Sequence, residues 1–237
     1  MNTAAQDMRP IVLLDLDNTI LDFNRAEHRA LRRALTVQGL PFDDEIAALY
    51  HRINMRHWEM LEDGLLTRAE VLVRRYEALF RELGVRADAE RTQGLYESYL
   101  AEGHWFMPGA EEMLRSLSGS CRLFICSNGV QRVQDGRIGS AGIAGYFEKI
   151  FISEHMGANK PERRFFELCF REIPGFDRSR AIILGDSLTS DIRGGINAEI
   201  LTCWFNPKGK ENEGPIKADY VIRDLGEFEG LLRRILG

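Results

Sequence analysis

The chain has 237 residues, with 31 Lys plus Arg against 36 Asp plus Glu. Its formal net charge of −5 argues against a nucleic-acid-binding protein, which normally carries a basic face. With 44% hydrophobic and 28% charged residues, it has the composition of a folded globular protein that needs no disulfides. No stretch approaches the ~20 apolar residues that span a bilayer, and residues 1–10 lack the apolar segment of a secretory signal. We therefore expect a cytoplasmic protein with four reduced cysteines.

Short, continuous apolar runs predict the strands of a parallel sheet. Strands that are buried on both faces read as unbroken hydrophobic runs rather than as alternating ones. From about residue 105 onward, strand and helix patterns alternate, as they do in α/β proteins. The expected fold class is a Rossmann-like parallel sheet flanked by helices. The predicted strands are 11–14, 123–126, 150–152, 181–184, 200–205 and 220–222, with helices at 108–117, 161–170 and 224–236.

A long stretch without any strand pattern separates the first predicted strand from the second. Four amphipathic helices are predicted there, at residues 25–37, 44–61, 67–83 and 88–100. Thr67 and Glu70 form a capping-box pattern at the start of the third helix. We predict that residues 22–104 form an inserted α-helical domain, and that residues 1–21 and 105–237 form the α/β core.

Three of the predicted strands end in polar clusters. These are Asp15-Leu16-Asp17-Asn18-Thr19, Ser127-Asn128-Gly129, and Gly185-Asp186-Ser187 with Asp191. Ligands of open α/β sheets bind outside the carboxyl ends of the strands, so the clusters are expected to converge on one site. Each cluster alone would be ordinary turn or helix-capping chemistry. Together, each after its own strand, they indicate an active site.

Carboxylates dominate this predicted site. Asp15 and Asp17 are two residues apart at a strand end, so their side chains can point to the same side. Asp186 and Asp191 add two more, and crowded like charges raise some of the pKa values. A divalent cation relieves this repulsion, and ligands that are all oxygen favour Mg²⁺. Lys160, just before a predicted helix, is a further source of positive charge.

Taken together, these segments resemble the haloacid dehalogenase-like hydrolase superfamily. Its four motifs match Asp15-Leu16-Asp17-Asn18-Thr19, Ser127, Lys160-Pro161 and the segment from Gly185 to Asp191. The resemblance covers essentially the whole chain. The helical insert is similar to the family's type 1 cap, which closes over the active site.

The resemblance also implies a role for each matching residue. Asp15 would be the nucleophile that becomes an aspartyl phosphate. Asp17 would protonate the leaving oxygen and then deprotonate the attacking water, while Lys160 would neutralise charge on Asp15 and on the phosphate. The other implied roles are phosphate or substrate binding by Asn18, Thr19, Ser127 and Asn128, and Mg²⁺ binding by Asp15, Asp17, Asp186 and Asp191.

A closer likeness concerns the branch within the superfamily. Residues 152–161, 191–198 and 202–206 resemble the bacterial pyrimidine 5′-nucleotidases. Asp17 separates phosphatases from dehalogenases, which lack this second acid. Residues 1–148 contain no lysine for the Schiff-base chemistry of phosphonoacetaldehyde hydrolases. The resemblance thus implies a Mg²⁺-dependent phosphomonoesterase acting on nucleoside 5′-monophosphates such as dUMP, dTMP and UMP. A sugar-phosphate phosphatase such as N-acylneuraminate-9-phosphatase, or a phosphosugar mutase, is the alternative.

The expected partner is therefore a small phosphorylated metabolite, with neither nucleic acid nor membrane involved, and the expected state is a monomer or homodimer. A non-catalytic protein that reuses the fold would have lost Asp15, Asp17 or Asp186, and all three are present. Residues 134–139 depart from the family, because they are rich in glycine where relatives have a more regular helix. The sequence offers no physical reason for this departure.

Overall fold

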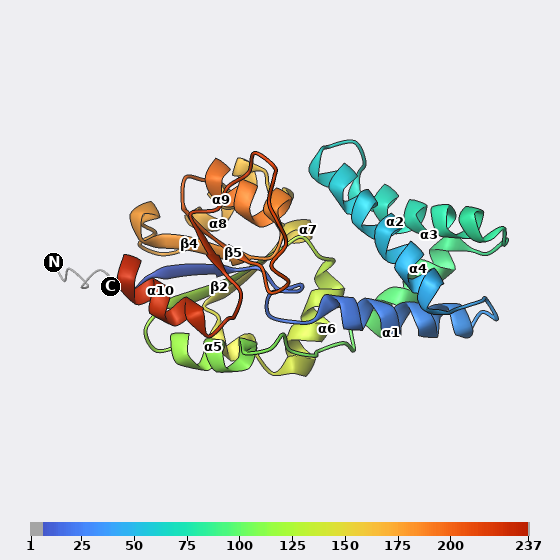
Figure 1. Cartoon of the computed structure of the whole chain (residues 1–237), viewed down its shortest axis with the longest axis horizontal. Coiled ribbons are helices and arrows are strands. Elements are labelled where there is room, and N and C mark those ends of the chain that lie inside the picture. Colours follow the sequence, from blue (N-terminus) through green and yellow to red (C-terminus); the bar gives the residue numbers. More distant parts are fainter. Residues whose placement is uncertain (1–6, 237) are drawn as a thin grey trace. The chain divides into compact units, whose positions relative to one another are not determined.

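A computed structural model describes residues 7–236 and contains a six-stranded parallel sheet (Figure 1). The strands are β1 (Ile11–Leu14), β2 (Arg122–Ser127), β3 (Lys149–Ile152), β4 (Ala181–Gly185), β5 (Leu201–Phe205) and β6 (Tyr220–Ile222). Their order in the sheet is β3-β2-β1-β4-β5-β6, and every pairing is parallel. Each strand forms at one of the predicted apolar runs, and the α/β class is confirmed.

The register of the central strands brings their carboxyl ends to one edge. Leu14 at the end of β1 is paired with Ile125 on β2 and with Leu184 on β4. The next residues along these strands therefore leave the sheet side by side, although up to 170 positions separate them in the sequence. This register sets the position of the polar clusters.

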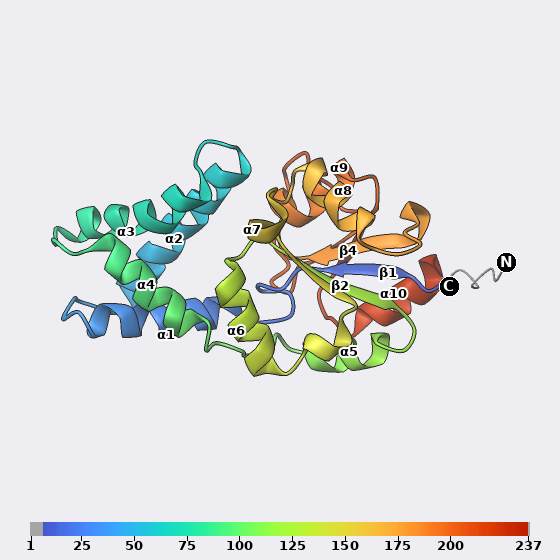
Figure 2. The same ribbon diagram turned by 180° about the vertical axis from the view of Figure 1, so that it is seen from behind.

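Helices cover both faces of the sheet (Figures 1 and 2). The helices of this unit are α5 (Ala110–Leu117), α7 (Ser153–Met156), α8 (Arg163–Arg171), α9 (Arg193–Asn197) and α10 (Glu227–Ile235), with short turns η1 (Ala144–Tyr146), η2 (Arg178–Arg180) and η3 (Leu188–Ile192). Both views place α5 and α10 on one side and α8 and α9 on the other. Buried on both faces, the strands need the continuous apolar runs that the sequence shows.

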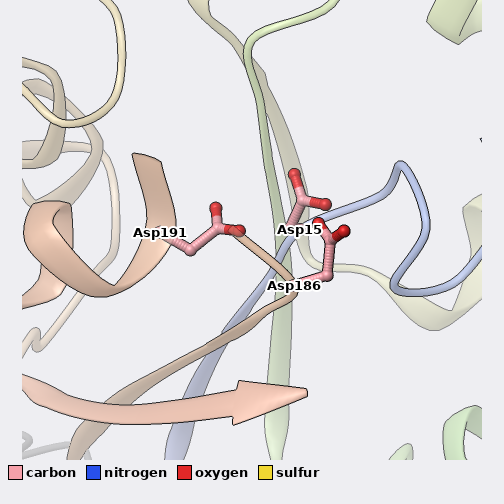
Figure 3. Close-up of side chains that lie close together, drawn as sticks. All are labelled: Asp15, Asp186 and Asp191. Carbon is pink, nitrogen blue, oxygen red and sulfur yellow. The ribbon is translucent and has the colours of Figure 1, made fainter. Parts of the chain in front are cut away.

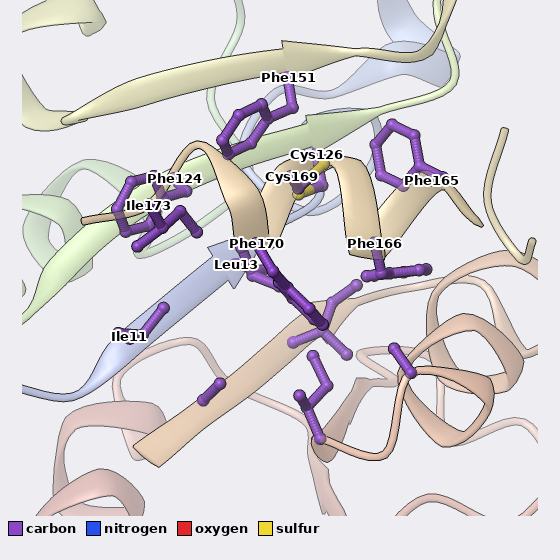
Figure 4. Close-up of a cluster of buried hydrophobic side chains, with 14 of the residues drawn as sticks. Ile11, Leu13, Phe124, Cys126, Phe151, Phe165, Phe166, Cys169, Phe170 and Ile173 are labelled. Carbon is purple, nitrogen blue, oxygen red and sulfur yellow. The ribbon is translucent and has the colours of Figure 1, made fainter. Parts of the chain in front are cut away.

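The core beneath α8 is aromatic (Figure 4). Phe165, Phe166 and Phe170 are buried along one side of the helix and pack into a cluster that includes strand residues of β1, β2 and β4. Fully burying side chains of this size stabilises the fold by about 1.5–3 kcal/mol each. The helix begins at Arg163 rather than at the predicted Pro161, because Pro161 belongs to the preceding turn, where its bond to Lys160 is cis.

The chain divides into two compact units. The α/β unit comprises the described residues up to 22, then 106–131 and those from 142 onward. The helical unit comprises residues 23–105 together with 132–141. Its helices are α1 (Phe23–Thr36), α2 (Asp44–Glu62), α3 (Arg68–Leu83), α4 (Ala89–Leu100) and α6 (Gln131–Ala141). In the described part of the chain, no helix is both long enough and apolar enough to cross a bilayer.

The glycine-rich segment 134–139 lies within α6 and has a packing role. A Cβ atom on Gly136 would lie 2.8 Å from Cβ of Ala101 and 2.9 Å from its carbonyl oxygen, so only glycine permits this close approach. The next residue, Arg137, is fully buried, and its Nε donates a hydrogen bond to the carbonyl of Gly103 over 2.9 Å. Local packing within the helical unit thus explains the glycine at position 136, whereas nothing lies within 4 Å of a Cβ added at Gly139.

Candidate active site

Asp15 lies immediately after β1, at the edge where the central strands end. Its backbone N–H still pairs with the carbonyl of Leu184 over 3.0 Å, which fixes the backbone at the end of the sheet. Its side chain is almost fully buried. One carboxylate oxygen accepts a hydrogen bond from Lys160 Nζ at 2.7 Å, and the other accepts one from Thr19 Oγ1 at 3.2 Å. These bonds fix the orientation of the predicted nucleophile.

Lys160 connects the clusters that follow β1, β2 and β4. Its ammonium group donates to Asp15 Oδ1 at 2.7 Å, to Asp191 Oδ1 at 2.7 Å and to the carbonyl of Cys126 at 2.6 Å. An ammonium group has three N–H bonds, so these contacts use all of its donors. The side chain is only 2% exposed, which makes this a desolvated ion-pair triad rather than a surface contact.

Asp191 joins Lys160 to the loop that follows β4. Its Oδ1 accepts from Lys160, and its Oδ2 accepts from the backbone N–H of Ser187 at 3.0 Å. The loop fits only because residue 185 is glycine, since a Cβ there would lie 2.1 Å from Asp191 Oδ2. Ser187 in turn caps η3 by accepting from the N–H of Ser190 at 3.1 Å. The Gly-Asp-Ser sequence thus builds a loop shaped around Asp191.

Three carboxylates face a common point at this edge (Figure 3). One oxygen each from Asp15, Asp186 and Asp191 lies within 4.8 Å of the others. Asp186 is held through its main chain, because its carbonyl accepts a hydrogen bond from the indole N–H of Trp204 at 2.9 Å. A set of donors made only of oxygens suits Mg²⁺. Both oxygens of Asp15 and both of Asp191 already accept one hydrogen bond, and each of these oxygens keeps a further lone pair for a cation.

Burial and like charges act strongly on these groups. Burial raises the pKa of Asp15 to about 7, against the opposing effect of the Lys160 ammonium. Burial, together with the charges of Asp15 and Asp191, holds the pKa of Asp186 well above its usual range. Burial alone would lower the pKa of Lys160, but the two carboxylates beside it raise that pKa overall. The site has more negative charge than one lysine offsets, and a divalent cation fits this imbalance.

Of the residues predicted to bind phosphate, Thr19 and Asn128 hold other members of the site, whereas Ser127 and Asn18 lie in the turns that follow β2 and β1. Thr19 is fully buried and its hydroxyl bonds Asp15, so it orients that carboxylate. Asn128 clamps the backbone of Lys160, donating to its carbonyl at 2.8 Å and accepting from its N–H at 2.9 Å. Ser127 ends β2, and its hydroxyl accepts from the N–H of Gly129 at 3.1 Å. Asn18 adopts a left-handed backbone with φ of 60° in the turn after Asp17.

Asp17 stands apart from the three clustered carboxylates. Its backbone makes a bridge with Leu21, which closes the turn that follows β1. Its carboxylate is outside the group formed by Asp15, Asp186 and Asp191, although its charge contributes to the raised pKa of both Asp15 and Asp186. This places a fourth acid near the site.

Two contributors were missed from the sequence. The first is Trp204, which holds Asp186 and lies opposite Gly185 in the register of β4 and β5. The second is the carbonyl of Cys126, which accepts from Lys160. Neither has a residue-type signal, because one acts through strand register and the other through the main chain. The order and register of the strands would have been needed to find them.

The family follows from a direct comparison. The sequence model of the haloacid dehalogenase-like hydrolases matches residues 10–199, which include every polar cluster described above. The chain therefore belongs to the haloacid dehalogenase-like hydrolase family. A fold and loop geometry of this kind is consistent with the superfamily resemblance of the motifs.

Three relatives place the chain within that family. Pyrimidine 5′-nucleotidase PynA of Streptococcus pneumoniae is 34% identical and covers 89% of this chain and 90% of its own length. Pyrimidine 5′-nucleotidase YjjG of Escherichia coli is 29% identical, over 93% of this chain and 96% of its own. The Bacillus subtilis protein YfnB, named as a HAD-hydrolase, is 39% identical over 93% and 94%.

The crystal structure of YfnB has the same fold. It matches with a TM-score of 0.90 and 38% identity, covering 95% of this chain and 99% of YfnB. That structure is described as bound to magnesium and as revealing interdomain movement in YfnB. Similarity at this level extends over both units of the present chain.

Proposed function

We propose that this hydrolase is a Mg²⁺-dependent phosphomonoesterase that acts on pyrimidine nucleoside 5′-monophosphates. The observation that carries the proposal is the buried triad in which Lys160 bridges Asp15 and Asp191 beside Asp186. The names of PynA and YjjG support the pyrimidine nucleotide as substrate. We expect the activity in the cytoplasm, where the four buried, unpaired cysteines stay reduced.

The proposed reaction has two steps. Asp15 attacks phosphorus and expels the nucleoside oxygen, which takes a proton from Asp17. Asp17, now a carboxylate, removes a proton from the water that attacks the phosphorus bonded to Asp15, and inorganic phosphate leaves. Splitting the reaction through a covalent intermediate replaces one very slow displacement by two faster ones. Asp17 suits an acid and base role because it follows the proposed nucleophile by two residues and its charge acts on that carboxyl group.

Positive charge must offset the approach of a phosphate dianion to a carboxylate. Lys160 supplies one charge at 2.7 Å from the nucleophile. Asp15 and Asp186, with the main-chain carbonyl of Asp17, would hold Mg²⁺, which supplies Lewis-acid stabilisation of the phosphoryl oxygens. We assign phosphoryl contacts to Ser127 and to the main-chain N–H of Asn128, because the side chain of Asn128 is engaged with Lys160.

We also propose that residues 22–104 act as a cap whose closure excludes water. The chain leaves and re-enters the α/β unit at adjacent points, where Leu21 bridges Phe106 and the N–H of Met107 donates to the carbonyl of Ile20 over 2.9 Å. Two crossings held side by side suit a hinge. The interdomain movement described for YfnB supports this proposal.

Phosphate release from a panel of substrates tests the function. With Mg²⁺, we expect the protein to hydrolyse dUMP, dTMP and UMP faster than purine nucleotides or sugar phosphates, and Asp15→Asn to abolish the activity. Preferred hydrolysis of N-acylneuraminate 9-phosphate would favour the sugar-phosphate alternative. An isomerised phosphosugar without free phosphate would favour a mutase. Full activity in Asp15→Asn would refute the mechanism.

A further inference from the structure

A second group of charged side chains lies on α1, in the helical unit (Figure 1). A hollow of about 580 Å³ is lined by Arg25, His28, Arg29, Arg32 and Arg33. These residues follow the spacing i, i+3, i+4, i+7, i+8, so they share one side of the helix. The opposite side is buried, and the only acid of the helix, Glu27, lies there, bonded to His51 and Asn54.

Aromatic rings fix three of these arginines. The guanidinium groups of Arg25 and Arg29 lie 4.8 and 5.0 Å from the ring centre of Trp105, and that of Arg33 lies 3.9 Å from the ring centre of Tyr99. Stacking uses the flat face of a guanidinium, so its N–H edge can still make hydrogen bonds, as that of Arg33 does to Glu102. Arginines ordered in this way lose less conformational entropy when they bind a ligand.

The charge of this face is only partly compensated. Arg33 pairs with Glu102, and His28 lies 3.2 Å from Asp44. Within residues 7–236, neither Arg29 nor Arg32 has a carboxylate within ion-pair distance. Like charges four residues apart destabilise a helix, so a cationic row of this kind in a chain of net charge −5 has an energetic cost. An anion that binds the row removes that cost.

We propose that this hollow binds a small anion with a di- or triphosphate group. The basic row runs along nine residues of helix, which at about 1.5 Å per step is about 12 Å and more than a single phosphate can bridge. The volume suits a small molecule. Glu102 and Asp44 carry negative charge beside two members of the row, which opposes the continuous phosphate backbone of a nucleic acid. None of the residues of the hollow belongs to the Asp15 and Lys160 cluster.

Binding of tripolyphosphate to the full-length, metal-free protein tests the proposal. Isothermal titration in the presence of excess orthophosphate, which occupies simple phosphate sites, is expected to show tripolyphosphate binding. The double variant Arg29→Gln/Arg32→Gln should bind it at least tenfold more weakly, because two charged hydrogen-bond donors are lost. The control Arg86→Gln/Arg91→Gln removes two exposed charges from the same unit and should bind within twofold of the unaltered protein.

Further probes define the source of the triphosphate group. Binding of a nucleoside triphosphate as tight as that of tripolyphosphate shows recognition of the phosphates alone, and tighter binding shows that the nucleoside adds contacts; both support the proposal. It is overturned if the unaltered protein does not bind tripolyphosphate, or if Arg29→Gln/Arg32→Gln binds it equally well. It is also overturned if a ten-nucleotide single-stranded DNA binds the same arginines more tightly. The single variant Arg32→Gln replaces the double one if the latter unfolds.

Discussion

At the scale of single residues, Lys160 supplies the positive charge that offsets the buried carboxylates of Asp15 and Asp191. Its replacement by Met would keep much of the side-chain volume but leave Asp15 and Asp191 without their shared cation. Breaking a buried ion pair by removing one partner costs about 3–5 kcal/mol. We therefore predict a loss of this size for Lys160→Met in urea unfolding. Lys208→Met, at an exposed position, should change stability by less than about 0.5 kcal/mol.

The loss should also depend on pH, and its sign follows from Asp15. The folded-state pKa of Asp15 is raised from 3.8 to about 7, and without the ammonium it would rise further. A carboxyl group with a raised folded-state pKa favours the folded state at low pH, and this contribution is lost as pH rises through that pKa. Lys160→Met should therefore be less destabilised relative to the unaltered protein at pH 5 than at pH 8. Equal losses at both pH values would show that Asp15 does not titrate in this way.

Trp204 acts on Asp186 through one hydrogen bond. Trp204→Phe keeps an aromatic ring but removes the N–H donor that holds the carbonyl of this proposed metal ligand. Groups that orient metal ligands commonly change metal affinity by about 10–100-fold when they are removed. We predict Mg²⁺ binding about tenfold weaker, measured by titration calorimetry, with Trp58→Phe in the helical unit as the control. An unchanged Mg²⁺ affinity in Trp204→Phe would show that the hydrogen bond from Trp204 does not position Asp186 for the metal.

Residue types and order along the chain were enough to predict Asp15, Lys160, Asp186 and Asp191 as one cluster. The structure brings them together, whereas their catalytic roles stay predictions. The hydrogen-bond partners of Thr19 and Asn128 could not be predicted from residue type and order, because a hydroxyl or an amide binds whichever neighbour folding places beside it. Both groups hold other members of the cluster.

At the scale of elements, two glycines of α6 provide a matched comparison. Gly136 is pressed against Ala101, whereas nothing lies within 4 Å of a Cβ added at Gly139. Gly136→Ala should destabilise the protein by about 1–3 kcal/mol through overpacking. Gly139→Ala should stabilise it by about 0.5–1 kcal/mol, since alanine restricts the unfolded chain and favours helix. Urea unfolding of both variants checks this, and equal effects would contradict the packing of α6 on Ala101.

Helix ends were less predictable than strands. The strands of this sheet are buried on both faces, so each appears in the sequence as an uninterrupted apolar run. The start of α3 was also readable, because Thr67 and Glu70 form both hydrogen bonds of the capping box. The start of α10 was not, since the helix begins at Glu227 after Asp224 has capped the preceding turn by bonding the N–H of Gly226.

At the scale of the whole molecule, metal binding should be linked to stability. The acidic cluster carries uncompensated charge when no cation is bound, so Mg²⁺ should bind the folded protein and not the unfolded chain. At 100 times its dissociation constant, a ligand of this kind stabilises the folded state by about 2.7 kcal/mol. We predict that Mg²⁺ raises the melting temperature, measured by calorimetry, and that Asp186→Asn removes the increase. An equal increase in Asp186→Asn would place the metal elsewhere.

The boundaries that the sequence predicts for the two domains stay predictions. The absence of strand patterns between the first two strands predicted a helical insert at 22–104, and four helices are found there. That residues 132–141 pack with these helices was not predicted, because the contact between Gly136 and Ala101 joins segments that have no shared sequence pattern. Long-range packing of this kind depends on the folded backbone.

The central position of β1 also affects how the protein is made. On the ribosome this strand emerges first, yet its partners β2 and β4 begin only at residues 122 and 181. Helices α1 to α4 depend on more local contacts and can form while β1 still lacks both neighbours. A nascent chain halted before Asp191 would therefore lack part of the acidic cluster even with helices α1 to α4 already formed, so the cluster can assemble only after β4 and the loop that follows it have been synthesised.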